Sequence, residues 1–97
     1  MRYEIIKAPE ADQDLKRLSA HVRAEVNDAI EIHLRHEPTK TSKNRIKRLR
    51  GLSRPQYRLR VGEVRVFYDV EGRSVHILAV VSKPDAARWL EKVGKQS

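Results

Sequence analysis

The sequence predicts an α+β fold in which an N-terminal strand and a helical hairpin pack on a mainly antiparallel sheet, with a short helix at the C-terminus. Two hydrophobic periods along the chain predict this arrangement. Before residue 38, apolar residues recur at steps of three and four, as they do along one face of an amphipathic helix. From residue 57 they alternate with polar residues, as they do along a half-buried strand. The 97 residues are expected to form one domain with one core.

The first part of the chain is predicted to hold one strand and two helices. Residues 2–6 mix apolar and polar side chains as a short strand does, and Ala8-Pro9-Glu10 favours a helix start because proline suits the first helical position. A second helix is expected from about residue 19 to near residue 36, because Pro38 disfavours helical backbone in the residue before it. The apolar stripes of the two helices are Ala8, Ala11, Leu15 and Leu18, followed by Val22, Val26, Ile30 and Leu34.

The second part is predicted to hold four strands and a final helix after a polar, basic stretch. The strands are expected at residues 46–52, 57–61, 64–70 and 75–81, and the helix at residues 86–93. Gly62-Glu63 and Glu71-Gly72 suit the tight turns between the last three strands, since glycine readily takes the backbone angles that such turns need. The strand at residues 75–81 is strongly apolar and is therefore expected to be central.

Composition excludes several classes of protein. The chain has no cysteine, so no disulfide or thiolate chemistry is available, and a reducing cytoplasm is expected. Its first residues lack the apolar run of a signal peptide, and the run at residues 77–81 is too short to span a membrane. The histidines show no metal-ligand spacing, so we expect neither a metal nor another cofactor. The net charge of +8 favours an anionic partner.

The positive charge is concentrated in one segment. No acidic residue lies between Glu37 and Glu63, whereas nine cations lie between residues 40 and 60. They are Lys40, Lys43, Arg45, Lys47, Arg48, Arg50, Arg54, Arg58 and Arg60. Like charges held close together repel one another, so a fold that gathers them usually serves an anionic partner. For a small protein without a metal motif, nucleic acid is the polyanion that we expect.

Three arginines are predicted to meet on one face of the sheet. With Gly62-Glu63 as a two-residue turn, Arg60 lies opposite Arg65, and Arg58 lies opposite Phe67. Their guanidinium groups offer planar pairs of donors that match phosphate oxygens. The alternative is that these arginines only keep an exposed sheet face soluble. The opposite face, with Leu59, Val61, Val64 and Val66, is expected to meet the helices.

Other charged residues flank the three arginines. Lys47, Arg48, Arg50 and Arg54 are expected to follow the neighbouring nucleic-acid backbone, and the alternative is a solvated basic face without a specific ligand. Asp69 is expected to offset arginine charge rather than to act as a base.

Three short motifs carry a resemblance to a known family. They are Leu49-Arg50-Gly51 ahead of a strand, Tyr57-Arg58-Leu59-Arg60 on that strand, and Arg65-Val66-Phe67-Tyr68 on the next. With the helical hairpin before them, the chain resembles the RelE/ParE superfamily of bacterial toxins over nearly its whole length. The resemblance implies a RelE-like fold across residues 1–97 and the role of the toxin in a type II toxin–antitoxin pair.

In the RelE branch, such toxins enter the ribosomal A site and cut mRNA without a metal, by attack of a 2′-hydroxyl on the adjacent phosphate. The resemblance implies that Arg58, Arg60 and Arg65 orient the phosphate and stabilise the transition state. Lys83 would replace a later arginine of the family, and Trp89 would stack on a base where several members have a tyrosine. Alternatively, Trp89 anchors the last helix in the core.

The implied partners are an antitoxin, usually acidic, together with the ribosome and mRNA. Two other functions stay open. A ParE-like inhibitor of DNA gyrase would use the helices and the tail, and it would leave the arginines without a direct role. A degenerate homologue would bind RNA or the antitoxin without cleaving RNA.

Overall fold

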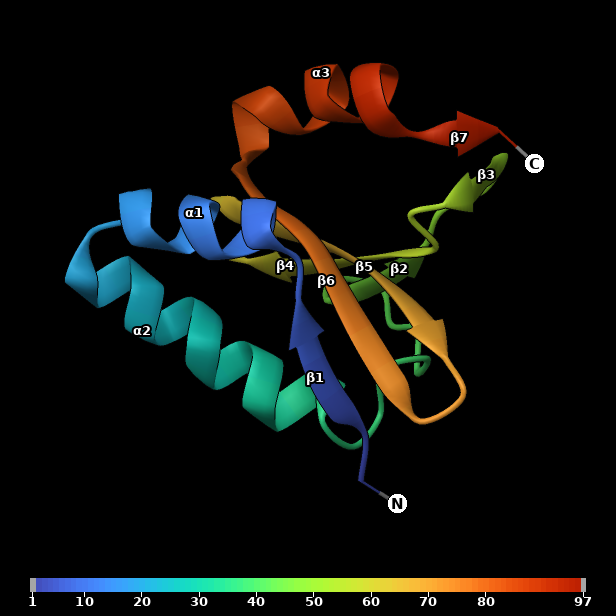
Figure 1. Ribbon diagram of the computed structural model, residues 1–97, viewed down its shortest axis with the longest axis horizontal. Helices are drawn as coiled ribbons and strands as arrows, with labels where there is room; N and C mark the ends of the chain where they lie inside the picture. The colour runs from blue at the N-terminus through green and yellow to red at the C-terminus, as the bar shows by residue number, and fades with distance from the viewer. Residues whose placement is uncertain (1, 97) are drawn as a thin grey trace.

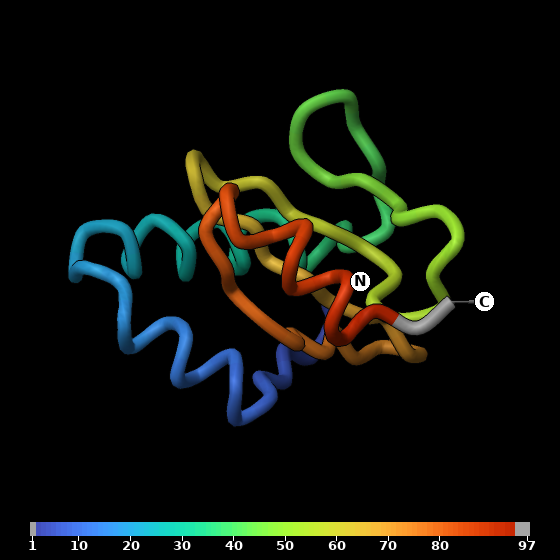
Figure 2. Tube along the Cα trace, turned by 90° about the horizontal axis from the view of Figure 1, so that it is seen from above, coloured from blue at the N-terminus to red at the C-terminus, as the bar shows by residue number. Residues whose placement is uncertain are grey.

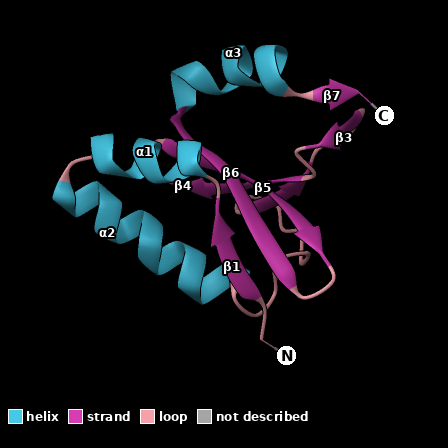
Figure 3. Ribbon diagram, in the orientation of Figure 1, coloured by secondary structure: helices cyan, strands magenta, loops and turns pink. Residues whose placement is uncertain are grey.

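The computed structural model describes residues 2–96, and they form the predicted α+β fold (Figure 1). In chain order, the elements are β1 (Glu4–Lys7), α1 (Pro9–Arg17), α2 (Ala20–Ala29), the π-helical turn η1 (Ile30–Leu34), β2 (Ile46–Arg48), β3 (Leu52–Arg54), β4 (Tyr57–Val61), β5 (Val64–Glu71), β6 (Ser74–Ser82), α3 (Lys83–Val93) and β7 (Lys95–Gln96). Figure 3 shows that the hairpin of α1 and α2 and the later helix α3 lie at separate places around the sheet.

The helical hairpin begins and turns at the residues that the sequence indicates. Ala8 is the N-cap of α1 with Pro9 next to it, and Ser19 caps α2 by accepting a 3.3 Å hydrogen bond from the N–H of Val22. Helical structure continues through η1 to Leu34, close to the predicted end. The stripe residues Ala11, Leu15, Val26, Ile30 and Leu34 are buried in the core.

The main sheet has the strand order β1-β6-β5-β4-β2. β1 runs parallel to β6, and the other neighbours are antiparallel, which confirms the prediction of a mainly antiparallel sheet. β6, the strand predicted to be central, is internal but lies one place from the centre, which β5 occupies. β5 is buried on both faces because the core with the helical hairpin covers one face and α3 covers part of the other.

The hairpin of β4 and β5 has the predicted register. Arg60 is paired with Arg65, and Arg58 is paired with Phe67. Gly62 takes the first turn position with a φ of 57°, a backbone angle that residues with a Cβ rarely adopt. On the other face, Leu59, Val64 and Val66 belong to the buried core and Val61 packs against it, as expected.

β1 spans Glu4–Lys7 instead of residues 2–6, and three further differences from the prediction have a local cause. The turn after β5 is formed by Gly72-Arg73 instead of Glu71-Gly72, because glycine takes the first turn position here as well, with a φ of 57°. The strand predicted at residues 46–52 is divided into β2 and β3 by a turn at Gly51, whose φ is 76°. α3 begins earlier than residue 86, at Lys83, because Pro84 fits the first turn of a helix.

The C-terminal segment crosses the sheet face that the helical hairpin leaves open (Figure 2). Trp89 on α3 stacks on Phe67 of β5, with the ring centroids 4.9 Å apart. β7 then pairs with β3 in a second, two-stranded sheet that was not predicted. Between residues 2 and 96, no helix is long and apolar enough to span a lipid bilayer.

Candidate nucleic-acid interface

The candidate site lies on the open face of the sheet, beside the turn between β4 and β5. Because side chains alternate along a strand, Arg58 and Arg60 on β4 share a face with Arg65 and Phe67 on β5. This face points away from the helical hairpin, since Leu59, between the two β4 arginines, lies in the core. The register therefore brings Arg58, Arg60 and Arg65 together, and we call these three residues the arginine cluster.

Arg65 is held in place by the turn. It is only 6% exposed, and its Nη1 donates hydrogen bonds to the carbonyl oxygens of Gly62 (2.8 Å) and Val64 (3.1 Å). A guanidinium fixed by two carbonyl groups has little rotamer freedom left to lose when a ligand binds. The position of Arg65 is therefore set before any ligand arrives.

Arg58 lies across from Phe67 and is half-buried. Its Nε is buried and has no hydrogen-bond partner among the described residues. Burial lowers the pKa of Arg58, and the nearby charges of Arg65 and Arg60 lower it further. Arginine keeps its proton in proteins, so the consequence is repulsion among three cations. A bound anion would relieve this repulsion.

The acidic side chains described in the structure form their ion pairs elsewhere. Asp69 is buried, with one carboxylate oxygen 3.0 Å from Nε of Arg54 and the other accepting a 2.7 Å hydrogen bond from the N–H of Gln56. Asp69 thus offsets arginine charge, but the charge is that of Arg54. The arginine cluster keeps its full positive charge.

Two of the four flanking cations are exposed on the surface. Lys47 is exposed and is paired across the strands with Arg58, so it shares the open face with the cluster. Arg50 is exposed in the turn after β2. Neither side chain has an ion-pair partner among residues 2–96.

The other two, Arg48 and Arg54, have partners within the protein. The guanidinium of Arg48 lies 5.2 Å from the ring centroid of Tyr57, which packs on the core side, and its Nη1 donates to the carbonyl oxygen of Gln56 (2.8 Å). Arg54 is bound to Asp69. The structure therefore places neither guanidinium in the arginine cluster.

Lys83 and Trp89 are both carried by α3. The backbone N–H of Lys83 donates to the carbonyl oxygen of Glu63 in the turn (2.7 Å), which places the start of α3 beside the arginine cluster. Trp89 stacks on Phe67 at an interplanar angle of 12°, and its Nε1 donates to a carboxylate oxygen of Glu10 (3.3 Å). These contacts fasten α3 to the sheet and fit the anchoring alternative for Trp89.

Two groups that transfer protons in many enzymes lie away from the cluster. His76 Nε2 is 3.4 Å from the carboxylate of Glu71, at the opposite end of β5 from the cluster. Tyr68 is buried, and its hydroxyl donates to the carbonyl oxygen of Pro38 (2.6 Å). Burial, and to a smaller extent Tyr57, raises the pKa of Tyr68 far above the usual range, so this hydroxyl stays protonated.

Arg45 reaches the edge of the cluster although it was not predicted as a site residue. Its carbonyl oxygen accepts a 2.9 Å hydrogen bond from the N–H of Arg60, and its guanidinium contacts His33. The positive charge of Arg45 was the one sequence feature that could have identified it. Because β2 begins at Ile46, residue 45 lies outside the strand alternation that identifies the other arginines.

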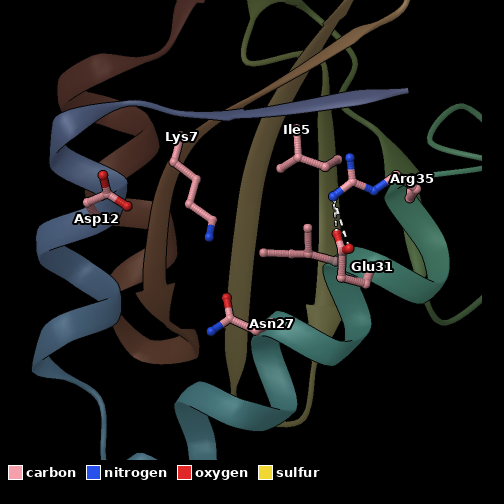
Figure 4. Close-up of a pocket in the computed structure, with 7 residues that line it drawn as sticks. Ile5, Lys7, Asp12, Asn27, Glu31 and Arg35 are labelled. Atoms are coloured by element: carbon pink, nitrogen blue, oxygen red, sulfur yellow. Dashed lines mark hydrogen bonds and ion pairs between the residues drawn. The ribbon is translucent and has the colours of Figure 1, made fainter. Parts of the chain in front are cut away.

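A separate cavity of about 460 Å³ opens between β1, α1 and α2 (Figure 4). On one side, Arg35 donates two hydrogen bonds to the carboxylate of Glu31 (2.6 and 2.9 Å); Lys7 and Asp12 carry opposite charges on the other. A cavity lined by both positive and negative side chains does not favour an anion as the arginine cluster does. In the part of the chain that the structure describes, no group of three or more His, Asp or Glu side chains could hold a metal ion.

The family is shown by a comparison with family models. The model described as the ParE toxin of type II toxin–antitoxin systems, parDE, matches residues 5–91. The match runs from β1 into α3 and includes the whole arginine cluster. The protein therefore belongs to this family, within the RelE/ParE superfamily of type II toxins. No match was found among curated protein sequences.

Solved structures of RelE proteins have the same fold. A chain of the RelE–RelB complex from Pyrococcus horikoshii OT3 has a TM-score of 0.70 at 24% identity, over 86% of this chain and 97% of that one. A chain of the RelB–RelE antitoxin–toxin complex from Methanococcus jannaschii has a TM-score of 0.68 at 24% identity, over 87% of this chain and 96% of that one. A mutant of the E. coli toxin RelE in the free state has a TM-score of 0.69 at 21% identity, over 94% of this chain and 93% of that one. These likenesses confirm the RelE-like fold.

Proposed function

We propose that this type II toxin cleaves mRNA on the ribosome without a metal ion. The observation that carries the proposal is the arginine cluster, whose three cations share one open face and lack an acidic partner among the described residues. Guanidinium groups without counter-ions are suited to the phosphates of a bound RNA strand. The fold shared with RelE toxins supports the same reading.

In the proposed reaction, a 2′-hydroxyl of the RNA attacks the adjacent phosphorus and the bond to the 5′-oxygen breaks. The products are a 2′,3′-cyclic phosphate and a 5′-hydroxyl, so the proton lost by the attacking group is balanced by the one gained by the leaving oxygen. Arg65, which the turn already holds, would orient the phosphate. Arg58 and Arg60 would stabilise the charge that develops on its oxygens, and Lys83 would add a cation beside the turn.

The arginine cluster contains only arginines, so it holds no group with a pKa near neutrality that could transfer a proton. Arginine is a poor general base because its pKa is so high. His76 and Tyr68 are occupied elsewhere, by Glu71 and Pro38. Catalysis by this chain would therefore depend on electrostatics and on a substrate positioned from outside, which is the part that the ribosome would supply.

An acidic antitoxin is the proposed protein partner. Two of the similar structures are complexes of a RelE toxin with a RelB antitoxin. A chain with a net charge of +8 attracts a partner of opposite charge, and an acidic segment laid over the arginine cluster would neutralise it.

Inhibition of DNA gyrase is the second candidate function, and the matching family model favours it because that model describes a ParE toxin. In that case the arginine cluster would have no direct role. The two candidates therefore differ in whether toxicity depends on Arg58 and Arg60.

The experiment is induction of the protein in a bacterial host, with protein and DNA synthesis pulse-labelled separately. An Arg58→Ala/Arg60→Ala variant removes cations from the cluster and leaves the turn contacts of Arg65 in place. Arg73→Ala is the matched control, because Arg73 is an exposed arginine in the turn at the other end of β5. Circular dichroism and thermal unfolding of the purified variants establish that both are folded.

The proposal predicts rapid loss of protein synthesis with the unaltered protein and with Arg73→Ala, and no loss with the double variant. Earlier loss of DNA synthesis, or unchanged toxicity in the folded double variant, would favour gyrase inhibition. Growth and mRNA that are unaffected by all three proteins would point to a homologue that binds without cleaving.

A further inference from the structure

We propose that Asn44, Arg45 and Arg60 form a second phosphate-binding subsite, which holds the backbone of single-stranded RNA just beyond the arginine cluster. The proposal rests on the proposed RNA cleavage, because it extends the same RNA-binding surface. The subsite lies where β2 begins, between the end of α2 and the turn that joins β4 to β5.

A cavity of about 570 Å³ gives the subsite its shape. It is lined by Ala29, Asn44, Arg45, Arg60, Val61 and Gly62. Arg60 belongs both to this cavity and to the arginine cluster, so the two positive regions are continuous. A strand bound at the cluster can therefore pass over Arg60 and enter the cavity without leaving the positive surface.

The backbone around Arg45 is fixed. Its carbonyl oxygen accepts the 2.9 Å hydrogen bond from the N–H of Arg60, which joins the start of β2 to β4. The hydroxyl of Ser42 accepts hydrogen bonds from the N–H groups of Arg45 (3.0 Å) and Ile46 (3.3 Å). Asn44 and Arg45 are thus held beside Arg60 before a ligand binds.

The side chain of Arg45 is oriented by a neutral partner. Its Nη1 contacts Nε2 of His33, and because a guanidinium can only donate, this ring nitrogen must accept. Burial lowers the pKa of His33, the charge of Arg45 lowers it further, and Glu37 opposes them. The nearby Glu37 forms an ion pair with Lys40 (3.3 Å). Arg45, which with His33 and Glu37 also lines a neighbouring cavity, is therefore positioned without an ion pair among the described residues.

The lining of the cavity favours RNA backbone over a protein segment. The apolar side chains there, Ala29 and Val61, are small, whereas protein interfaces are usually anchored by a large apolar or aromatic side chain in a matching pocket. The polar side chains are two arginines and an amide, all of which donate hydrogen bonds to phosphate oxygens. Continuity with the arginine cluster extends the positive surface along which a nucleic-acid strand can lie.

The test measures binding of the purified chain to a 2′-O-methyl RNA of about ten nucleotides, which cannot be cleaved by the proposed reaction. Affinity is measured by fluorescence anisotropy at several salt concentrations. Arg45→Ala removes the charge, Arg45→Lys keeps it, and Asn44→Ala removes the amide without touching the contact between Arg45 and His33. Arg73→Ala is the control for a lost surface charge, and thermal unfolding shows whether each variant is folded.

With the subsite, Arg45→Ala lowers affinity about five- to tenfold at about 50 mM salt and reduces the slope of log K against log salt by about 0.7, the value for one phosphate contact with a single strand. Arg45→Lys keeps the slope, Asn44→Ala loses about twofold in affinity, and Arg73→Ala matches the unaltered chain. If Arg45→Ala and Asn44→Ala both match Arg73→Ala, the subsite is refuted.

Two further outcomes separate this inference from the proposed function. If Arg45→Ala weakens binding of a poly-glutamate peptide but not of RNA, the cavity serves an acidic protein and the RNA subsite is wrong. If the unaltered chain does not bind RNA at any salt concentration, the subsite is wrong, whereas the proposed cleavage, in which the ribosome positions the mRNA, is refuted only by intact mRNA on ribosomes. If the variants refute the subsite while the unaltered chain binds RNA, the proposed cleavage is not affected.

Discussion

Arg60 and Arg65 lie directly opposite each other on β4 and β5, so two like charges occupy one cross-strand position. Such a pair normally weakens a hairpin. The two side chains differ, however, because Arg65 is buried and bonded to the carbonyl oxygen of Gly62 (2.8 Å), whereas Arg60 is exposed. Arg65 thus stabilises the turn, whereas the charge of Arg60 remains at the surface.

This difference predicts effects of different size on stability. Arg65→Ala should lower the free energy of unfolding by about 1.5–3 kcal/mol, the usual contribution of hydrogen bonds from a charged group. Arg60→Ala should change it by less than about 0.5 kcal/mol, or raise it slightly by removing repulsion. Urea denaturation of the two variants measures the difference, and equal effects would contradict the assignment of these roles.

The hydroxyl of Tyr68 provides a second prediction. It donates a 2.6 Å hydrogen bond to the carbonyl oxygen of Pro38, and both residues are buried. Tyr68→Phe should therefore lower the free energy of unfolding by about 1–3 kcal/mol, because a buried acceptor is left without its donor. Tyr57→Phe is the matched control: its ring stacks on Tyr68 with centroids 5.4 Å apart. Similar losses for both variants in urea denaturation would refute this explanation.

Asp14 links α1 to β6 and predicts a dependence on pH. Its carboxylate accepts a 2.9 Å hydrogen bond from the buried N–H of Val80. Burial raises the pKa of Asp14 above 3.8, opposed by the Val80 bond, with a smaller rise from Glu10 and a smaller reduction from Arg17. A raised pKa in the folded state means that the folded protein binds this proton more tightly than the unfolded chain. The contribution of Asp14 to stability is therefore greatest below 3.8 and falls as pH rises through its folded pKa.

Asp14→Asn keeps an oxygen acceptor and removes the titration. Its stability relative to the unaltered chain should rise as pH increases from 3.8 through the raised pKa of Asp14, because the carboxyl of the folded chain ionises over that interval. Asp14→Ala leaves the N–H of Val80 unpaired and should be less stable than Asp14→Asn by about 1–3 kcal/mol. Chemical denaturation across this pH range measures both effects. A free energy of unfolding of Asp14→Asn that falls relative to that of the unaltered chain as pH rises would contradict this explanation.

Trp89 is predicted to hold α3 on the sheet. It is the single tryptophan of the chain, and its ring is stacked on the buried Phe67. Trp89→Ala should lower stability by roughly 2 kcal/mol, less than for a fully buried tryptophan because Trp89 is half-exposed. Amide hydrogen exchange should become faster in α3 and stay unchanged in β5.

Arg88→Ala, on the exposed side of the same helix, is the control and should leave the exchange of α3 unchanged. Protection of α3 that survives the loss of Trp89 would show that other contacts hold the helix. In the unaltered chain, a red shift of tryptophan emission on binding of a partner would report displacement of α3 from Phe67.

The hairpin of β4 and β5 could be predicted in full because its information is local. Gly62 marks the turn, and the alternation on both sides leaves one register that buries Leu59 and Val66 together. The helical hairpin was predictable for the same reason, since Pro9 and Ser19 mark its helix starts. The convergence of the arginine cluster followed from this register.

Features that depend on distant contacts could not be predicted from local patterns. β1 runs parallel to β6, and β7 pairs with β3, although more than 40 residues separate each pair in the sequence. The same limit applies to charge. Nothing local distinguishes Arg48, which lies over Tyr57, or Arg54, which binds Asp69, from cations that remain free.

Mapping of RNA ends on ribosomes decides whether this protein cleaves mRNA through the arginine cluster, as proposed. The purified chain is added to ribosomes that are paused on a defined mRNA, and the products are analysed for their position and end chemistry. If the cluster cleaves mRNA, the cut lies in the A-site codon and leaves a 2′,3′-cyclic phosphate and a 5′-hydroxyl, with Arg73→Ala active and Arg58→Ala inactive. Intact mRNA with the unaltered chain, or equal cleavage by a folded Arg58→Ala variant, would contradict it.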